Sequence, residues 1–238
     1  MISVCIATYN GAKYIGEQLS SILPQLDGSD EVIISDDGST DGTTDIIATF
    51  TDSRIRVIDG AHRGVPVWNF EKAISEAKGD YIFLSDQDDI WADNKVAVTM
   101  HYLRDYDCVI SDCIVTDESM NAISPSFYTH NRSKPGRFYN LLVRNGYLGC
   151  CMAFTRRVRS AALPFPANIP MHDIWIGNMS AFYFRTKFID TPLIYYRRHN
   201  GNFTQDSGQS PNSLITKLTN RLTVIADLCR MCRRKTSR

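Results

Sequence analysis

Several features that would place the chain in a familiar class are missing from its sequence. No apolar run is long enough to span a bilayer as a helix, so no transmembrane segment is expected. The first residues, MISVCIATYNG, lack the basic start and long apolar stretch of a signal peptide and are typical of a β-strand. The seven cysteines show no paired zinc-ribbon spacing, which favours reduced thiols. We therefore expect a cytoplasmic protein.

Two common phosphate-binding motifs are also absent. The sequence contains neither GxxxxGK[ST] nor GxGxxG, which argues against a P-loop and against a dinucleotide fingerprint. A metal ion that bridges a diphosphate is the natural substitute. This favours a nucleotide-diphosphate donor over NAD or a kinase-type ATP site, and we expect no nucleic-acid partner.

Acidic residues are scarce in the second half of the chain. Residues 1–119 carry 22 acidic and 8 basic side chains, whereas residues 120–238 carry 4 acidic and 18 basic ones, so the net charge of zero hides a strong asymmetry. Such a split predicts two halves with different roles or different neighbours. The alternative, that the halves simply attract each other, stays open.

Apolar runs alternate with helical spacings through the first half. We expect strands at 2–9, 31–35, 54–59 and 81–85, and a helix at 67–77. Continuous apolar strands between helices indicate a parallel sheet covered on both faces. In the less regular second half, strands are expected at 108–115, 147–154 and 187–199, and a helix at 172–184. With 238 residues, 43% of them hydrophobic, the chain suits one α/β domain.

Polar residues follow three of these strands directly. Tyr9 ends the first strand, Asp36 and Asp37 follow the second, and Asp86 follows the fourth. Because ligands of parallel sheets bind beyond the carboxyl ends of the strands, these residues are expected to form a site.

Three carboxylates, in the stretch SDQDDIW, stand within four positions of each other. Asp86, Asp88 and Asp89 repel one another unless protons or a cation offset their charge. Positions 86 and 88 point the same way along an extended backbone, and two carboxylates on one side suit Mg²⁺ or Mn²⁺. Capping of the next helix is the alternative, and it accounts for one aspartate rather than three.

At this point several blocks carry a resemblance. CIATYNGAKYIGEQLSSIL, IISDDGSTDGT and GDYIFLSDQDDIW resemble the signature blocks of family-2 glycosyltransferases, and GCCMAF, HDIWIG and LIYYRRHNGNFT resemble the rhamnosyltransferase-like branch. The similarity spans about residues 2–205 with the blocks in order. It implies a GT-A-type α/β fold, with a mostly parallel central sheet, helices on both faces, and a C-terminal amphipathic helical tail.

The resemblance also implies a division of the chain. Residues 1–118 would be the nucleotide-sugar-binding half, residues 119–205 the acceptor-binding and catalytic half of the same domain, and residues 206–238 a basic amphipathic helix. The charge split near residue 119 agrees with the first boundary.

Roles for individual residues follow from the same resemblance. Asp173 would be the catalytic base; from the residues alone it could equally cap the helix that begins there. The implied nucleotide-binding residues are Ala7, Tyr9, Asp37 and Asp86. The metal ligands would be Asp88, the second acid of the DxD motif, and His199. Supporting roles are expected for Asp36, Asn69, Asp89, His172 and Trp175.

One position departs from the family pattern. Many relatives carry an Arg-Asn pair before the fourth strand, whereas here Trp68 precedes Asn69. The arginine's contact with the diphosphate would therefore come from elsewhere or be absent.

The implied activity is sugar transfer with inversion. The donor would be dTDP-L-rhamnose or a UDP-hexose, and the acceptor a hydroxyl of a glycan or polyprenyl-linked glycan in surface polysaccharide biosynthesis. Two alternatives use the same residues: a nucleotidyltransferase or phosphohydrolase, and a nucleotide- or glycan-binding module without catalysis. The first lacks the lysine- and glycine-rich N-terminal loop expected of sugar nucleotidyl transfer.

The tail has its own pattern. Leu214, Leu218, Leu222, Ile225 and Cys229 fall near one helical face, and CRMCRRKTSR at 229–238 contains five basic and no acidic residues. Such a segment could rest peripherally on the inner face of the cell membrane. A frayed tail and a helix that forms a homodimer are the alternatives.

Overall fold

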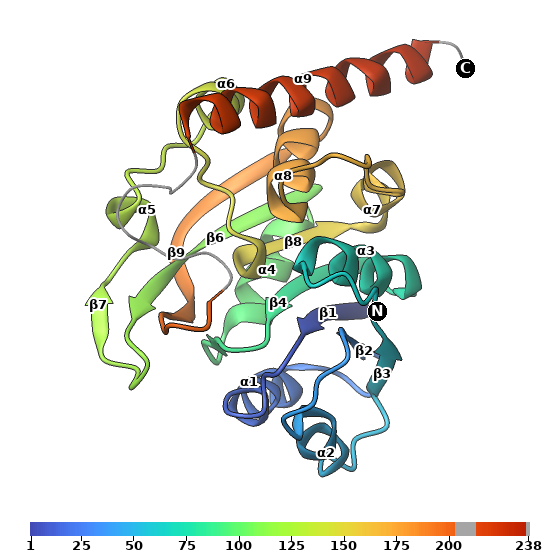
Figure 1. Ribbon diagram of the computed structural model, residues 1–238, viewed down its shortest axis with the longest axis vertical. Helices are drawn as coiled ribbons and strands as arrows, with labels where there is room; N and C mark the ends of the chain where they lie inside the picture. The colour runs from blue at the N-terminus through green and yellow to red at the C-terminus, as the bar shows by residue number, and fades with distance from the viewer. Residues whose placement is uncertain (203–212, 237–238) are drawn as a thin grey trace.

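A twisted sheet forms the centre of the protein in the computed structural model, which describes residues 1–202 and 213–236 (Figure 1). Within these residues the strand order is β3-β2-β1-β4-β8-β6-β9-β5, with β7 paired to β6. The strands are β1 (Ile2–Thr8), β2 (Glu31–Asp36), β3 (Ile55–Asp59), β4 (Tyr81–Asp86), β5 (Ile90–Trp91), β6 (Cys108–Thr116), β7 (Ala122–Ser124), β8 (Met152–Thr155) and β9 (Thr186–Arg197).

The first four long strands are parallel, as their apolar sequences predict. β1 lies between β2 and β4, and both pairings are parallel. Strands buried on both faces need apolar side chains throughout, and the interior of β1 and β2 meets this requirement. β8 is antiparallel to β4 and β6, while β6 and β9 are parallel to each other. The predicted α/β fold class is thus confirmed; within the described residues the sheet is mixed, with its parallel part from β3 to β4 and between β6 and β9.

Helices cover both faces of the sheet. α1 (Ile15–Ile22), α2 (Thr43–Ala48) and α4 (Lys95–Leu103) lie on one face; α3 (Pro66–Glu76), α7 (Arg156–Ala162) and α8 (His172–Tyr183) lie on the other (Figure 1). Short helices α5 (Phe127–His130) and α6 (Arg137–Leu142) follow β7, and 3-10 turns occupy Leu23–Gln25 and Gly149–Cys151. This arrangement matches right-handed crossovers between the parallel strands.

Local departures from the predicted strands have simple causes. The segment 147–154 is a strand only from Met152, because residues Gly149–Cys151 form a 3-10 turn. β9 continues through Pro192, which pairs with Asp112 where the register of β6 shifts; a bulge of this kind tolerates a residue without an N–H. β5, two residues long, pairs with β9 and was not predicted.

The predicted C-terminal helix is present as α9 (Leu214–Thr236), and it packs in part on the body of the protein. Val224 and Leu228 are buried, and the Tyr183 hydroxyl donates a hydrogen bond to the Leu228 carbonyl at 2.6 Å. Leu218 and Leu222, which the pattern assigned to the apolar face, are each 57% exposed. Among the described helices, none has the length and apolar character that a membrane span requires.

Candidate functional site

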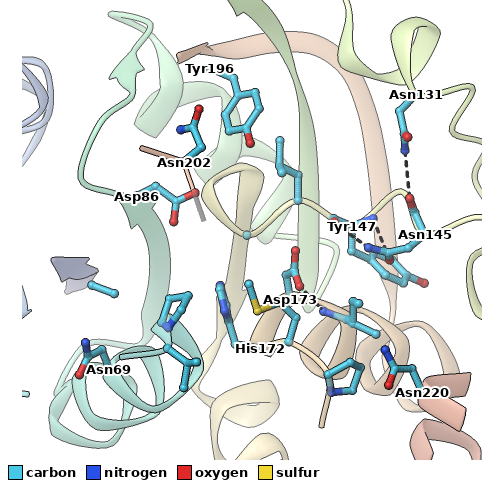
Figure 2. A pocket seen from close by; sticks show the side chains of 18 of the residues that line it. Asn69, Asp86, Asn131, Asn145, Tyr147, His172, Asp173, Tyr196, Asn202 and Asn220 are labelled. Carbon is cyan, nitrogen blue, oxygen red and sulfur yellow. Dashed lines mark hydrogen bonds between the residues drawn. The ribbon is translucent and has the colours of Figure 1, made fainter. Parts of the chain in front are cut away.

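The carboxyl ends of three strands meet at one edge of the sheet. Thr8 of β1 pairs with Asp36 of β2, and the neighbouring Ala7 pairs with Asp86 of β4. β1 is the strand at which the chain order reverses, so the crevice beyond it is the place where α/β sheets bind ligands. A cavity of about 950 Å³ opens there (Figure 2).

Asp37 and Tyr9 form one end of this cavity, together with Ala7. Asp37 Oδ2 accepts a hydrogen bond from the Gly64 N–H at 2.8 Å. Its other carboxylate oxygen is buried and has no hydrogen-bond partner in the described chain. A buried acceptor of this kind is expected to have a donor, and a bound ligand can supply one. The Tyr9 ring is 54% exposed, which leaves it open to stacking.

Asp36 stabilises the loop beside this end and does not line the cavity. Its carboxylate accepts from the Gly38 and Ser39 N–H groups and from the Ser39 hydroxyl. Asn69 does line the cavity, and its Oδ1 is fixed by the Ala61 N–H at 2.8 Å. Asp36 is therefore a structural residue, whereas Asn69 is positioned to reach a ligand.

Gln87 joins the ends of β1 and β4, a role that the sequence did not reveal. Its Oε1 accepts from the Thr8 hydroxyl at 2.6 Å and from the Tyr9 N–H at 2.9 Å, and its amide donates to the Tyr9 carbonyl. A side chain on Gly11 would lie 2.3 Å from Gln87 Oε1, so the glycine permits this contact. The middle residue of the DxD segment thus holds the loop that carries Tyr9.

The acidic cluster beyond β4 is strongly desolvated. Desolvation raises the pKa of Asp86 to about 8, and the carboxylates of Asp88 and Asp173 add to the effect. Burial, again reinforced by Asp88, raises the pKa of Asp89 well above its usual value. The Cys150 thiol, to which the sequence analysis gave no role, also belongs to this cluster: its Sγ and one carboxylate oxygen each of Asp86 and Asp89 all lie within 4.8 Å of one another. Carboxyl groups buried together in this way keep their protons unless a bound cation replaces those protons.

His199 contacts this cluster from the far end of β9. Its Nε2 lies 2.8 Å from Asp88 Oδ2, which also accepts from the Asn202 amide at 3.0 Å. The Gly201 N–H donates to His199 Nδ1 at 3.1 Å. Nδ1 is thus an acceptor, and Nε2 carries the proton that it donates to Asp88. His199 does not line the cavity itself but lies directly behind Asp88.

The donor set suits a hard divalent cation. Asp86 and Asp88 offer carboxylate oxygens to the cavity, and Asp89 has a buried oxygen without a hydrogen-bond partner in the described residues. Adjacent octahedral ligands with bonds of about 2.1 Å lie roughly 3 Å apart, close to the 2.8 Å between Asp88 and His199. Ligation by His199 Nε2 requires its proton to move to Nδ1, which the Gly201 N–H would have to release.

Asp173 faces the cluster from the start of α8, near enough for its charge to act on Asp86. It is the second residue of α8, whose N-cap is Met171, and its Oδ1 accepts from the Ile174 N–H at 2.6 Å. Desolvation raises the pKa of Asp173 to about 7. Figure 2 shows the Asp86 and Asp173 carboxyl groups directed toward the same space. A carboxylate with a pKa near neutrality can accept a proton from a bound hydroxyl group.

His172, next to Asp173, is a neutral polar group in the cavity wall. Its ring stacks on Phe70 at 3.9 Å, and neither ring nitrogen has a hydrogen-bond partner in the described chain. Burial lowers the pKa of His172 to about 3. Its Nε2 faces the Gly149 backbone, where a side chain on Gly149 would lie 2.6 Å away, so the neutral ring supports the wall behind Asp173.

The structure separates the remaining aromatic and basic candidates. Trp175 is buried in the core, where its indole N–H donates to the Ala162 carbonyl, so it does not reach the cavity. Arg197 is buried and pairs with Glu17. Arg198 lines the cavity and donates to the Tyr196 hydroxyl at 2.9 Å. The Trp68 ring, which replaces the usual arginine, lies under Arg63 at 4.8 Å and outside this cavity.

The second half of the chain contributes a wall that the sequence analysis missed. Asn131 donates to the Asn145 carbonyl, and Asn145 donates to the Tyr147 carbonyl, so these amides hold the wall in shape (Figure 2). Further lining residues are Asn140, Arg144, Lys217, Asn220 and Arg221. Polar residues in irregular segments give no periodic signal, and tertiary contacts alone bring these together.

Comparison with known proteins agrees with this geometry. The sequence profile of Glycosyl transferase family 2 matches residues 3–163. This match covers more than half of the chain and includes the strand-end acids. The chain therefore belongs to glycosyl transferase family 2.

Three curated relatives show the range of the similarity. The glycosyltransferase GlyG of Streptococcus pneumoniae is 37% identical over 50% of this chain and 41% of its own length. The UDP-Glc:alpha-D-GlcNAc-diphosphoundecaprenol beta-1,3-glucosyltransferase WfaP of Escherichia coli is 30% identical over 85% of this chain and 79% of its own. The dTDP-rhamnosyl transferase RfbG of Shigella flexneri is 29% identical over 83% and 72%.

Solved structures share the fold at low identity. TarS of S. aureus in complex with UDP-GlcNAc has a TM-score of 0.65 and 20% identity, over 84% of this chain and 59% of that chain. The mannosyltransferase PcManGT of Pyrobaculum calidifontis, in complex with GDP-Man and Mn²⁺, has a TM-score of 0.64 and 21% identity, over 85% and 58%. The chain thus spans less than two thirds of these proteins, and the likeness supports a GT-A-type fold.

Proposed function

We propose that the protein is an inverting, metal-dependent glycosyltransferase that moves a sugar from a nucleotide-diphosphate donor to a hydroxyl group of a glycan or lipid-linked glycan in polysaccharide biosynthesis. One observation carries the proposal. One cavity is lined by three features together: Asp37, whose Oδ1 has no partner among the described residues; the carboxylates of Asp86 and Asp88; and Asp173, whose carboxyl group has a near-neutral pKa.

The nucleotide end follows from hydrogen-bonding chemistry. Uracil and thymine each carry an N3–H donor, which the unpartnered oxygen of Asp37 can accept. The exposed Tyr9 ring stacks on the base, and Ala7 and Asp86 line the path toward the ribose. Both dTDP-L-rhamnose and a UDP-hexose present these features, in keeping with the names of RfbG and WfaP.

The diphosphate lies beside the acid cluster in this proposal. Asp88, assisted by Asp86 and by His199 once its proton has moved, would hold Mg²⁺ or Mn²⁺, and Asp89 supports them from the buried side. When bound, the cation neutralises charge on the departing diphosphate. Arg198, which lines the cavity, replaces the arginine missing at Trp68 as a contact for the phosphates.

Asp173 accepts the proton of the acceptor hydroxyl as the oxygen attacks the anomeric carbon. Its raised pKa makes it a stronger base than an exposed aspartate. One displacement by the acceptor, with no covalent sugar–enzyme step, inverts the configuration at that carbon. Asn69, which lines the cavity, is placed to hydrogen-bond the donor, and His172 supports the wall beside Asp173.

The two halves and the tail take separate roles in this scheme. Residues 1–118 bind the donor, and residues 119–205 contribute Asp173 and the asparagine wall for the acceptor. Residues 206–212 lie outside the described residues, as do the side chains of 233–238, where much of the tail's basic charge lies. Peripheral contact with the inner face of the cell membrane through 206–238 stays a prediction, as does a homodimer.

A donor screen tests the function. Purified protein is incubated with a panel of UDP-, dTDP- and GDP-sugars with Mn²⁺ or Mg²⁺, and released nucleotide diphosphate is measured. We expect release from a UDP- or dTDP-sugar and its loss in EDTA. Release of pyrophosphate or nucleoside monophosphate would indicate a nucleotidyltransferase or phosphohydrolase. Binding of a nucleotide sugar without any release, whichever acceptor is added, would indicate a binding module.

A further inference from the structure

The cavity carries opposite charge at its two ends. The end at the sheet edge is acidic, with Asp37, Asp86, Asp88 and Asp173. The outer rim is basic, with Arg144, Lys217 and Arg221. The first of these basic residues follows α6 and the other two belong to α9. The donor proposal uses the acidic end and leaves the basic rim without a role.

These three basic side chains have donors to spare. Arg144 donates to the Asn131 carbonyl at 2.9 Å, and Arg221 donates to the Val143 carbonyl at 2.8 Å. A guanidinium has five N–H donors, so one such bond leaves others for an anion. The ion pairs within the described part of the chain involve other residues, and Asp227, the acid of α9, pairs with Arg230. The rim is therefore positively charged and open to a ligand.

An exposed apolar band adjoins the rim. Its members are Leu142 and Val143 at the end of α6, and Ile215, Leu218 and Leu222 on α9, with exposed fractions from 49% to 78%. The bond from Arg221 to Val143 joins the two segments, and Figure 1 shows α6 beside the first turns of α9. Apolar side chains gathered in this way on a surface mark an interaction site.

The spacing on α9 links the band to the cavity. Lys217, Asn220, Arg221 and Val224, spaced as i, i+3, i+4 and i+7, line the cavity. At about 100° per residue, Leu218 lies roughly 60° round the helix from Arg221, and Leu222 and Ile215 lie farther round toward solvent. A ligand leaving the cavity past Arg221 would meet Val143 and Leu218 first, and the rest of the apolar band beyond them.

We propose that the basic rim binds the phosphate groups of a lipid-linked acceptor and that the apolar band holds the hydrocarbon chain of the same molecule. The occupant is argued from complementarity. Anionic phosphates match Arg144, Lys217 and Arg221, and a chain attached to them matches the adjoining Leu218 and Leu222. The inference rests on the proposed function and names its acceptor class, with the acceptor's sugar extending inward toward Asp173.

A binding experiment in EDTA tests the site without the metal. The probes are farnesyl diphosphate, inorganic pyrophosphate and farnesol, added to the full chain, with affinities measured by calorimetry. EDTA removes the cation that would otherwise draw a diphosphate to Asp88. We expect farnesyl diphosphate to bind more tightly than either pyrophosphate or farnesol, because it alone satisfies both the rim and the band.

Matched variants assign the binding to these residues. K217Q/R221Q should weaken farnesyl diphosphate binding about tenfold or more, since each replaced cation loses a charge-assisted bond. L218S/L222S should weaken farnesyl diphosphate binding while leaving pyrophosphate unchanged. R104Q, at an exposed position that ends α4 outside the cavity, should change neither. Unchanged affinity in both double variants would overturn the proposal.

Two further results separate this proposal from its neighbours. UDP binding with Mn²⁺ should be the same in all variants, because none of them alters the proposed nucleotide site. If the unmodified chain does not bind UDP at all, that result counts against the proposed function and not against the rim. Flotation with vesicles of phosphatidylglycerol in phosphatidylcholine tests a general membrane contact. The acceptor site would be overturned if the protein stays on these vesicles but binds farnesyl diphosphate no more tightly than pyrophosphate.

Discussion

Asp88 Oδ2 and His199 Nε2 lie 2.8 Å apart, although 111 residues separate them along the chain. The loop after β4 and the segment after β9 meet here at the carboxyl ends of their strands. His199 also stacks near Tyr14, with ring centroids 4.5 Å apart, so its ring is held from a third segment. The pair is therefore fixed in place before any ligand binds, as a metal or diphosphate site requires.

Replacing His199 tests its proposed contribution to cation binding. We expect H199A to weaken Mn²⁺ binding by at least about tenfold, because a ligand and the partner of Asp88 are both lost. Nucleotide affinity measured in EDTA should change little. Mn²⁺ titration followed by electron paramagnetic resonance provides the measurement, with the exposed His101 as control through H101A. Equal Mn²⁺ affinity in the two variants would remove His199 from the site.

The D173N variant tests the proposed base. Transfer should fall by about a hundredfold to ten-thousandfold, because the amide cannot accept the hydroxyl proton. Donor binding should persist, since the proposed contacts to the base come from Tyr9 and Asp37 and not from Asp173. Rates of sugar transfer and UDP affinity with Mn²⁺ are measured side by side. Normal transfer by D173N would contradict the assignment.

The wild-type pH profile gives a second view of the same residue. With a pKa of about 7, Asp173 is protonated below neutrality and ionised above it. We expect kcat/KM to rise with pH through about 7 and then to level off, with a slope of one proton. A profile that is flat across this range would show that Asp173 is not the group whose ionisation limits the reaction.

Stability should depend on pH and cation together. Without a cation, the folded pKa values of Asp86 and Asp173, about 8 and about 7, exceed the 3.8 of an unperturbed aspartate. The folded state then holds protons that the unfolded chain releases, so these groups lower stability as pH rises from 3.8 toward 8. Saturating Mn²⁺ should raise Tm by several degrees near pH 8 and by less near pH 5.

Thermal melts at both pH values, with Mn²⁺ or EDTA, measure this effect. Calorimetry in buffers of different ionisation enthalpy should also show protons released as the cation binds. A D86N variant offers a control, because it removes one titrating group and should reduce the number of protons released. An increase in Tm that is the same at both pH values would contradict the linkage.

Base discrimination should depend on the unpaired oxygen of Asp37. D37N should lower UDP affinity about tenfold to a hundredfold, because the amide can present N–H groups to the N3–H of uracil. Cytosine has an acceptor at N3, so CDP should lose less affinity or gain some. Competition between UDP and CDP in the wild type and in D37N gives the ratio. D36N is not a suitable control, because Asp36 stabilises the neighbouring turn.

The sequence by itself determined the sheet and the edge at which the site forms. Apolar runs such as ISVCIAT and EVIIS specify strands through local side-chain chemistry, and an aspartate directly after a strand must lie at that strand's carboxyl end. For this reason the positions of Tyr9, Asp37 and Asp86 followed from pattern alone.

Tertiary structure alone decided how the residues at that edge divide their roles. Adjacent Asp36 and Asp37 are alike in sequence, yet one is saturated by its own turn and the other keeps a free oxygen. The amphipathic pattern of α9 could not show which stripe packs, because burial of Val224 and Leu228 depends on α8 and the neighbouring fold. Contacts between distant segments set these outcomes, and local periodicity carries no information about them.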